Sequence, residues 1–174
     1  ATFLRPDAVA ASAEARKAAP NVAILYAWLR GTPESNASPS HSVLEAATRL
    51  LGLGPGLTPS GDDFLGGLLI ALRLMNRGAL SARLWTGLEA AAARRSLDLS
   101  VAHLSAAAAG RGSAALHAAL NALVTGRADD LPAELERIEE IGHTSGWDAL
   151  AGAVTALRSV TEGPVNRGQA ANPA

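Results

Sequence analysis

Apolar side chains recur at intervals of three and four residues over most of this chain, which is the spacing of one face of an α-helix. The stretch 42–51 shows the pattern clearly, with Val43, Ala47 and Leu50 on one stripe and Gly52 as its end. Runs of β-branched or aromatic residues with a period of two are missing from the sequence. The pattern therefore predicts an all-α fold, a single helical domain of about seven to nine helices.

Proline and glycine set the predicted boundaries. Pro20 is expected to end a first helix over 6–19, and Gly31 to end a second over 22–29. Further helices are predicted over 42–51, 60–76, 82–95, 97–109, 113–124, 132–141 and 146–160. These elements divide the chain into N-terminal helices and a loop (1–40), a helical core (41–162) and a tail that should fray (163–174).

One polar motif occurs twice, each time at the start of a predicted helix. The two copies are Gly54-Pro55-Gly56-Leu57-Thr58-Pro59-Ser60-Gly61-Asp62-Asp63 and His143-Thr144-Ser145-Gly146-Trp147-Asp148. With Ser60 aligned to Ser145, seven of thirteen positions agree without a gap. The repeat predicts a pseudo-symmetric pair of motif helices whose N-terminal ends build one site.

Both copies have the features of a ligand-binding helix start. Ser60 and Asp63 fit a capping pair, and Thr58 before Pro59 is an alternative cap. A helix N-terminus with free N–H groups attracts a carboxylate, a phosphate or a carbonyl oxygen. The same features also make a sound helix start without any ligand, but their repetition favours binding. The expected substrate-binding residues are Gly54, Gly56, Thr58, Ser60, Gly61, Asp63, Thr144, Ser145, Gly146 and Asp148.

Asp62 and His143 are the candidate catalytic residues. Adjacent helical positions point in different directions, so Asp62 and Asp63 cannot both cap the helix. We expect Asp63 and Asp148 to cap, which leaves Asp62 for a substrate donor or for Mg²⁺, the one cofactor that the residues suggest. Asp62→Asn should then keep the fold while weakening binding or activity about tenfold or more. His143 can act as an acid or base near neutral pH.

Small residues suggest that the two motif helices meet. Glycine in a helix interior lowers stability by about 1 kcal/mol relative to alanine. The presence of Gly66, Gly67 and Gly152 within predicted helices therefore requires an explanation. A close crossing of the two helices supplies one and would turn Ser60 and Ser145 toward one pocket. The alternative is that each helix packs closely on some other neighbour.

Composition limits the partners. The charged fraction is 18%, below the roughly 25% of an average domain, which leaves apolar surface for other subunits or a homo-oligomer. A net charge of −1 gives no field to attract nucleic acid. The apolar run 64–72 is too short for a membrane span, and no signal peptide is visible. We therefore expect a cytoplasmic protein without nucleic-acid or membrane partners. The sequence also lacks an initiator Met, so an N-terminal portion of a longer protein is expected to be absent.

Other polar residues are weaker candidates. His41, His103 and His117 have no acid or histidine at metal-ligand spacing and are interpreted as structural or surface residues. Arg111, between Gly110 and Gly112, could meet an anion, but ordinary turns between helices have the same composition. Trp85 and Trp147 are expected in the core or in an interface.

The stretches 52–65 and 142–148 resemble the two signatures of a bacterial family typified by the third, AllH-type subunit of oxamate carbamoyltransferase. The resemblance covers roughly 50–157 and implies work on oxalurate, carbamoyl phosphate and oxamate beside two other subunits. Family members are usually longer. The resemblance therefore implies a subunit of a carbamoyltransferase-like enzyme, with a small anionic substrate held at two helix N-termini.

Two other functions stay open at this stage: a non-catalytic subunit that assembles the enzyme or binds a small acid, and a structural helical interaction domain. Asp62, Asp63 and Asp148 would repel a phosphate or carboxylate. Either a divalent ion bridges them, or the acids act as caps and arginines from elsewhere bind the anion.

Overall fold

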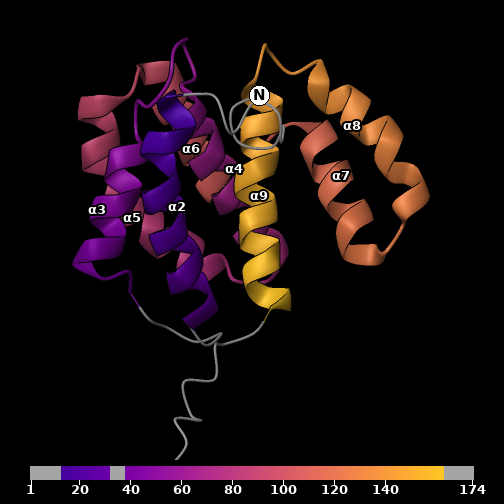
Figure 1. Ribbon diagram of the computed structural model, residues 1–174, viewed down its shortest axis with the longest axis horizontal. Coiled ribbons are helices and arrows are strands. Elements are labelled where there is room, and N and C mark those ends of the chain that lie inside the picture. The colour runs from indigo at the N-terminus through magenta and orange to yellow at the C-terminus, as the bar shows by residue number, and fades with distance from the viewer. Residues whose placement is uncertain (1–12, 32–37, 163–174) are drawn as a thin grey trace, which may run out of the picture.

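The computed structural model describes residues 13–31 and 38–162, and every regular element in these ranges is a helix (Figure 1). In chain order they are α2 (Ala13–Gly31), α3 (His41–Leu50), α4 (Ser60–Leu74), α5 (Gly78–Arg95), α6 (Asp98–Ala108), α7 (Ala114–Thr125), the 3₁₀ turn η1 (Ala128–Asp130), α8 (Leu131–Glu139) and α9 (Ser145–Thr161). The helices share one core. The predicted all-α domain is confirmed.

Helix α4 is the centre of this core. Most of its side chains are buried, as expected for a helix that is apolar on nearly all sides. It packs against α9 most extensively and also against α6, α5 and α3. Figure 1 shows α7 and α8 as a hairpin on one side of α9, with α2, α3 and α5 on the other.

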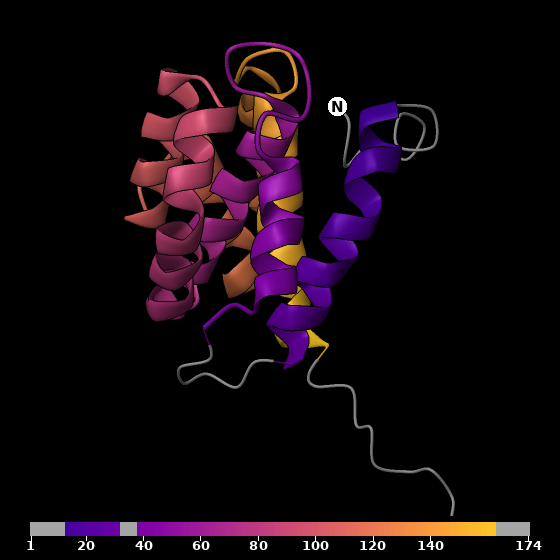
Figure 2. The same cartoon turned by 90° about the vertical axis from the view of Figure 1, so that its left-hand side faces the viewer.

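The predicted helix end at Pro20 is wrong, because α2 continues through this residue to Gly31. Ala18, Leu25 and Leu29 are buried on both sides of the proline, so packing on α3 and α9 outweighs the lost backbone hydrogen bond. The Asn21 side chain donates to the Lys17 carbonyl (3.0 Å), which satisfies one acceptor near the proline. Figure 2 shows α2 leaning away from the other helices toward its N-terminal end.

Several predicted parts lie outside the described residues. They are the first predicted helix before residue 13, the loop 32–37 and the tail 163–174. Within the described ranges, α5 starts at Gly78, four residues before the predicted start at 82. No helix there has the length and hydropathy needed to cross a membrane.

The sequence repeat corresponds to a repeated helical hairpin, α3–α4 and α8–α9. A Cβ atom on Gly61 would lie well inside 3.0 Å of the Leu50 carbonyl oxygen, at the end of α3. A Cβ atom on Gly146 would meet the Ile138 carbonyl, near the end of α8, in the same way. Glycine is therefore required in both copies because the new helix starts directly against the end of the previous one.

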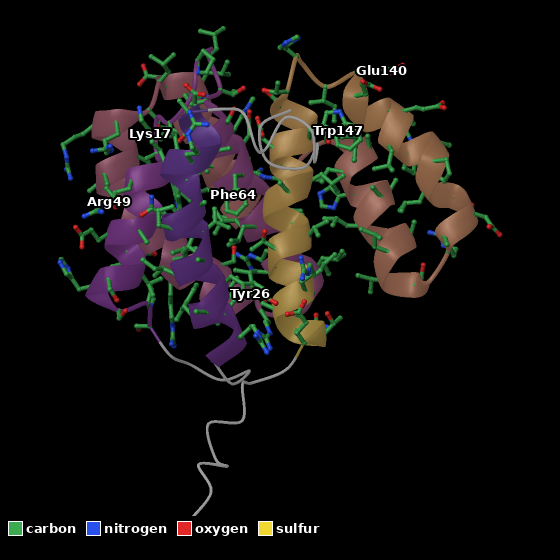
Figure 3. All side chains as sticks on the ribbon, viewed as in Figure 1. Lys17, Tyr26, Arg49, Phe64, Glu140 and Trp147 are labelled. Atoms are coloured by element: carbon green, nitrogen blue, oxygen red, sulfur yellow. The ribbon has the colours of Figure 1, made fainter. Side chains whose placement is uncertain are left out.

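The two hairpins meet through α4 and α9 at equivalent positions. Gly67 lies against the Ala149 carbonyl, and Gly152 lies against the Phe64 carbonyl. In the alignment of the two copies Gly67 matches Gly152 and Phe64 matches Ala149, so the contact is reciprocal. Phe64 itself is buried between the helices (Figure 3). The predicted close crossing is confirmed, and the alternative of separate neighbours is wrong.

Candidate functional site

A cavity of about 530 Å³ lies beside the N-terminal ends of the two motif helices. Apolar and small residues of α4, α6, α7 and α9 form its walls, among them Ile70, Leu104 and Leu116. Its buried polar groups include Asp62 and Ser100, whereas its exposed edge carries His103 and Arg111. The cavity therefore has an acidic interior and a basic rim.

Thr58 and Ser145 join the two copies of the motif at this cavity. Their hydroxyl oxygens are 3.0 Å apart, and both residues line the space. Ser60 is buried and does not line it. Ser145 therefore lines the cavity as expected, but in the first copy Thr58 lines it where Ser60 was expected.

The predicted side-chain caps are wrong. The N-cap of α4 is Pro59, and neither α4 nor α9, whose N-cap is Thr144, has a side-chain capping bond. Ser60 is the first helical residue and cannot cap. Asp63 cannot complete a capping box either, because Pro59 has no N–H group to donate to its carboxylate.

Several N–H groups at these helix starts are already used within the protein. The Gly61 N–H donates to the Leu53 carbonyl (2.9 Å), and the Gly146 N–H donates to the Ile141 carbonyl (3.1 Å). The Asp62 N–H donates to the Pro59 carbonyl (2.8 Å). The expectation of open N–H groups is therefore wrong for these three residues.

The cavity separates the predicted site residues into two groups. Thr58, Asp62, Asp63, Ser145 and Gly146 line it. Gly54, Gly56, Ser60, Gly61, His143, Thr144 and Asp148 do not. His143 is exposed, and Asp148 is fully buried.

Asp62 holds three parts of the protein together. It is 2% exposed; its Oδ1 accepts from the Gly52 N–H (2.9 Å) and its Oδ2 from the Ser100 hydroxyl (2.7 Å). These bonds tie α4 to the loop before it and to α6. No group of three or more His, Cys, Asp or Glu side chains in the described ranges is placed to hold a metal ion. A ligand or Mg²⁺ at Asp62 stays a prediction.

Asp63 is the acid of the cavity with an altered proton affinity. The pKa of its carboxyl is raised from 3.8 to about 7, mainly by burial; hydrogen bonds from Ser145 and Thr58 oppose the rise, and the charges of Asp148 and Asp62 add to it. Its Oδ2 is buried and has no hydrogen-bond partner in the described part of the chain. Asp63 is therefore able to change charge near neutral pH.

Sequence reasoning left His103 and Arg111 out of the predicted site, although both line the cavity. His103 lies on α6, and Arg111 lies in the turn between α6 and α7, far in sequence from both motifs. The signal for Arg111 was the Gly110-Arg111-Gly112 turn, but its composition is shared with turns that bind nothing. Trp85 and Trp147 were interpreted correctly, since both pack against the core.

The fold and the cavity define a helical protein in which a duplicated hairpin builds one acid-lined site. The chain belongs to the family described as oxamate carbamoyltransferase subunit AllH, which matches residues 50–157. No curated protein and no solved structure matches the chain. The resemblance inferred from the two motifs is confirmed.

Proposed function

We propose that this chain is a subunit of a carbamoyltransferase and that its cavity binds the small acid on which the enzyme acts. One observation carries the proposal: every residue that lines the cavity, from Thr58 to Ala149, lies within the stretch 50–157 that matches the family. The family name supplies the reaction class, and the cavity supplies a place for a ligand within the matched region.

The chemistry of the lining suits a molecule such as oxamate, which has an amide at one end and a carboxylate at the other. The carboxylate of Asp63 accepts hydrogen bonds from an amide nitrogen when it is ionised. The hydroxyls of Thr58 and Ser145, which hydrogen-bond to each other and to Asp63, can rotate to donate to a carbonyl oxygen of the ligand instead. Arg111 provides positive charge at the exposed edge, where His103 also lies.

Partner subunits are part of this proposal. Leu123, Val124 and Val160 are 38–55% exposed, and they lie beside an apolar groove of about 430 Å³ formed by α7, α9 and the end of α4. Exposed apolar surface of this kind favours contact with another protein. It supports the expected association with other enzyme subunits.

Calorimetric titration of the purified chain with oxamate and with carbamoyl phosphate tests the proposal. We expect oxamate to bind and Thr58→Val to weaken its binding about fivefold, because a hydrogen bond worth about 1 kcal/mol is lost. Thr155→Val is the matched control, since Thr155 donates to the Ala151 carbonyl (2.8 Å) and lies outside the cavity.

The result also separates the alternatives. Binding of oxamate without turnover in the assembled enzyme would favour a non-catalytic subunit that binds a small acid. Equal affinities of wild type and Thr58→Val would place the ligand elsewhere. Failure of the chain to bind either compound would leave a structural interaction domain as the better description.

A further inference from the structure

We infer that the turn between α6 and α7 is the anion-binding edge of the cavity and that Arg111 anchors the carboxylate of the ligand. This inference rests on the proposed function, and it names the residue that sets the specificity of the site. A positive charge at Arg111 would offset the repulsion that Asp62, Asp63 and Asp148 exert on an anion.

The backbone of this turn is held by its own hydrogen bonds. The Arg111 N–H donates to the Ala106 carbonyl (2.9 Å) and the Gly110 N–H to the Ala107 carbonyl (2.8 Å). Gly110 has φ +79°, a left-handed conformation that favours glycine at the end of a helix. Arg111 therefore leaves the helix end in a defined direction.

The turn is also fixed against α4. The Arg73 side chain donates from Nε to the Ala108 carbonyl (2.7 Å), which ties the end of α6 to the last turn of α4. Gly112 lies so close to Ile70 that a Cβ atom would fall within 3.0 Å of its side chain. Because Ile70 lines the cavity, this contact places the turn directly on the cavity wall.

A second turn in the same chain shows what an arginine does at this position without a cavity. Gly126 has φ +71°, and the Arg127 N–H donates to the Ala122 carbonyl (2.9 Å), as in the first turn. The Arg127 guanidinium pairs with Asp130 (2.8 Å) and contacts the Thr125 hydroxyl (3.1 Å). The guanidinium of Arg127 thus already has hydrogen-bond partners among residues close to it in the sequence.

The Arg111 side chain has no hydrogen-bond or ion-pair partner among the described residues, and it lines the cavity. His103 on α6 and the N-terminus of α7, which starts after Ser113, lie at the same edge. A helix N-terminus carries partial positive charge and adds to the attraction for an anion. A planar guanidinium suits a carboxylate because it donates two parallel hydrogen bonds.

The charges give the bound ligand a direction. Its carboxylate lies at Arg111, and its hydrogen-bond donors point to the acids of α4. The chemical class is a small monocarboxylate with an amide or ureido group at its other end. A second negative charge at that end would meet Asp63 and is disfavoured.

Calorimetry with oxamate and with its neutral methyl ester tests the role of Arg111. We expect Arg111→Gln to weaken oxamate binding about tenfold or more, because a charge-assisted hydrogen bond is lost, and to leave methyl oxamate binding unchanged. Arg127→Gln should change neither. Equal losses for oxamate and its ester would show a merely structural role, and no loss for oxamate would overturn the inference.

NMR of the arginine Nε–H groups separates this inference from the proposed function. The signals of Arg111 and Arg127 can be assigned with the same two variants and followed during titration with acetate, a simple carboxylate. We expect the Arg111 signal to shift at lower acetate concentrations than the Arg127 signal. If it does and oxamate binds no better than acetate, the proposed function fails while the anion site stands. If both signals shift together, Arg111 is not an anion site.

Discussion

Gly67→Ala tests the packing that brings the two motifs together. The added Cβ atom would fall well inside 3.0 Å of the carbonyl oxygen of Ala149, and it would lie 2.5 Å from the carbonyl carbon and 2.9 Å from the Cα atom of this residue. All three belong to the α9 backbone, so no side-chain rotation can make room. The helices must separate at the point where they approach most closely.

The expected loss follows from two opposing effects. Alanine in a helix interior is favoured over glycine by about 1 kcal/mol. Overpacking in a core costs about 1–3 kcal/mol, and an immovable backbone places this site at the upper end or beyond it. We expect a net loss of about 2 kcal/mol or more, which lowers the Tm of a domain of this size by about 4–8 °C.

Gly66→Ala is the matched control on the same helix. Its Cβ atom would lie 3.8 Å from the Ala107 Cβ, which is ordinary van der Waals contact. This variant should gain up to about 1 kcal/mol from helix propensity alone. Urea unfolding followed by circular dichroism measures both variants. If Gly67→Ala is as stable as Gly66→Ala, the close crossing of α4 and α9 is refuted.

Three further predictions concern the acids of the site. Below pH 3.8, Asp63→Asn should have the same free energy of unfolding as wild type. As pH rises toward about 7, the variant should become the more stable of the two, because wild type must ionise a half-buried carboxyl. Solvent screening limits this gain in stability to about 1–2 kcal/mol. If urea unfolding gave a stability difference between the two proteins that did not change with pH, the raised pKa of Asp63 would be contradicted. Asp62→Ala should lower the free energy of unfolding by about 2–4 kcal/mol, because the Gly52 N–H and the Ser100 hydroxyl lose a charged acceptor. An unchanged melting temperature would show that these two hydrogen bonds contribute little. Calorimetry with Mg²⁺ tests the predicted metal at Asp62: heat that disappears in Asp62→Asn supports it, and the same heat in both proteins places the ion elsewhere.

Several features of the site could be predicted from the sequence because they are local or repeated. The repeated Ser-Gly-x-Asp pattern located the two helix starts, and the small residues at Gly67 and Gly152 indicated their contact. Thr58 and Ser145 were both among the candidate residues, although Ser60 was expected to take the place that Thr58 occupies. A loop of glycines and prolines does not reveal which of its polar side chains turns inward.

The roles of the acids and of Arg111 could not be predicted in this way. Asp62 was expected to be free for a ligand because Asp63 was expected to cap the helix. Its partner Ser100 lies 38 residues away on another helix, and nothing in the local pattern indicates that contact. Arg111 was weighed as an anion ligand, but only the position of its turn on the cavity wall distinguishes it from Arg127.

The sequence by itself determined the helical class, the positions of most helices and the pairing of the two motifs, because periodicity, helix-ending residues and small-residue spacing act within one segment or between two copies of it. Tertiary structure decided that α2 continues through Pro20, that Asp63 has a raised pKa and that Arg111 lines the same cavity as the motif residues. Each of these depends on burial and on contacts between residues far apart in the chain. Packing energy, desolvation and long-range charge arise only when the helices come together.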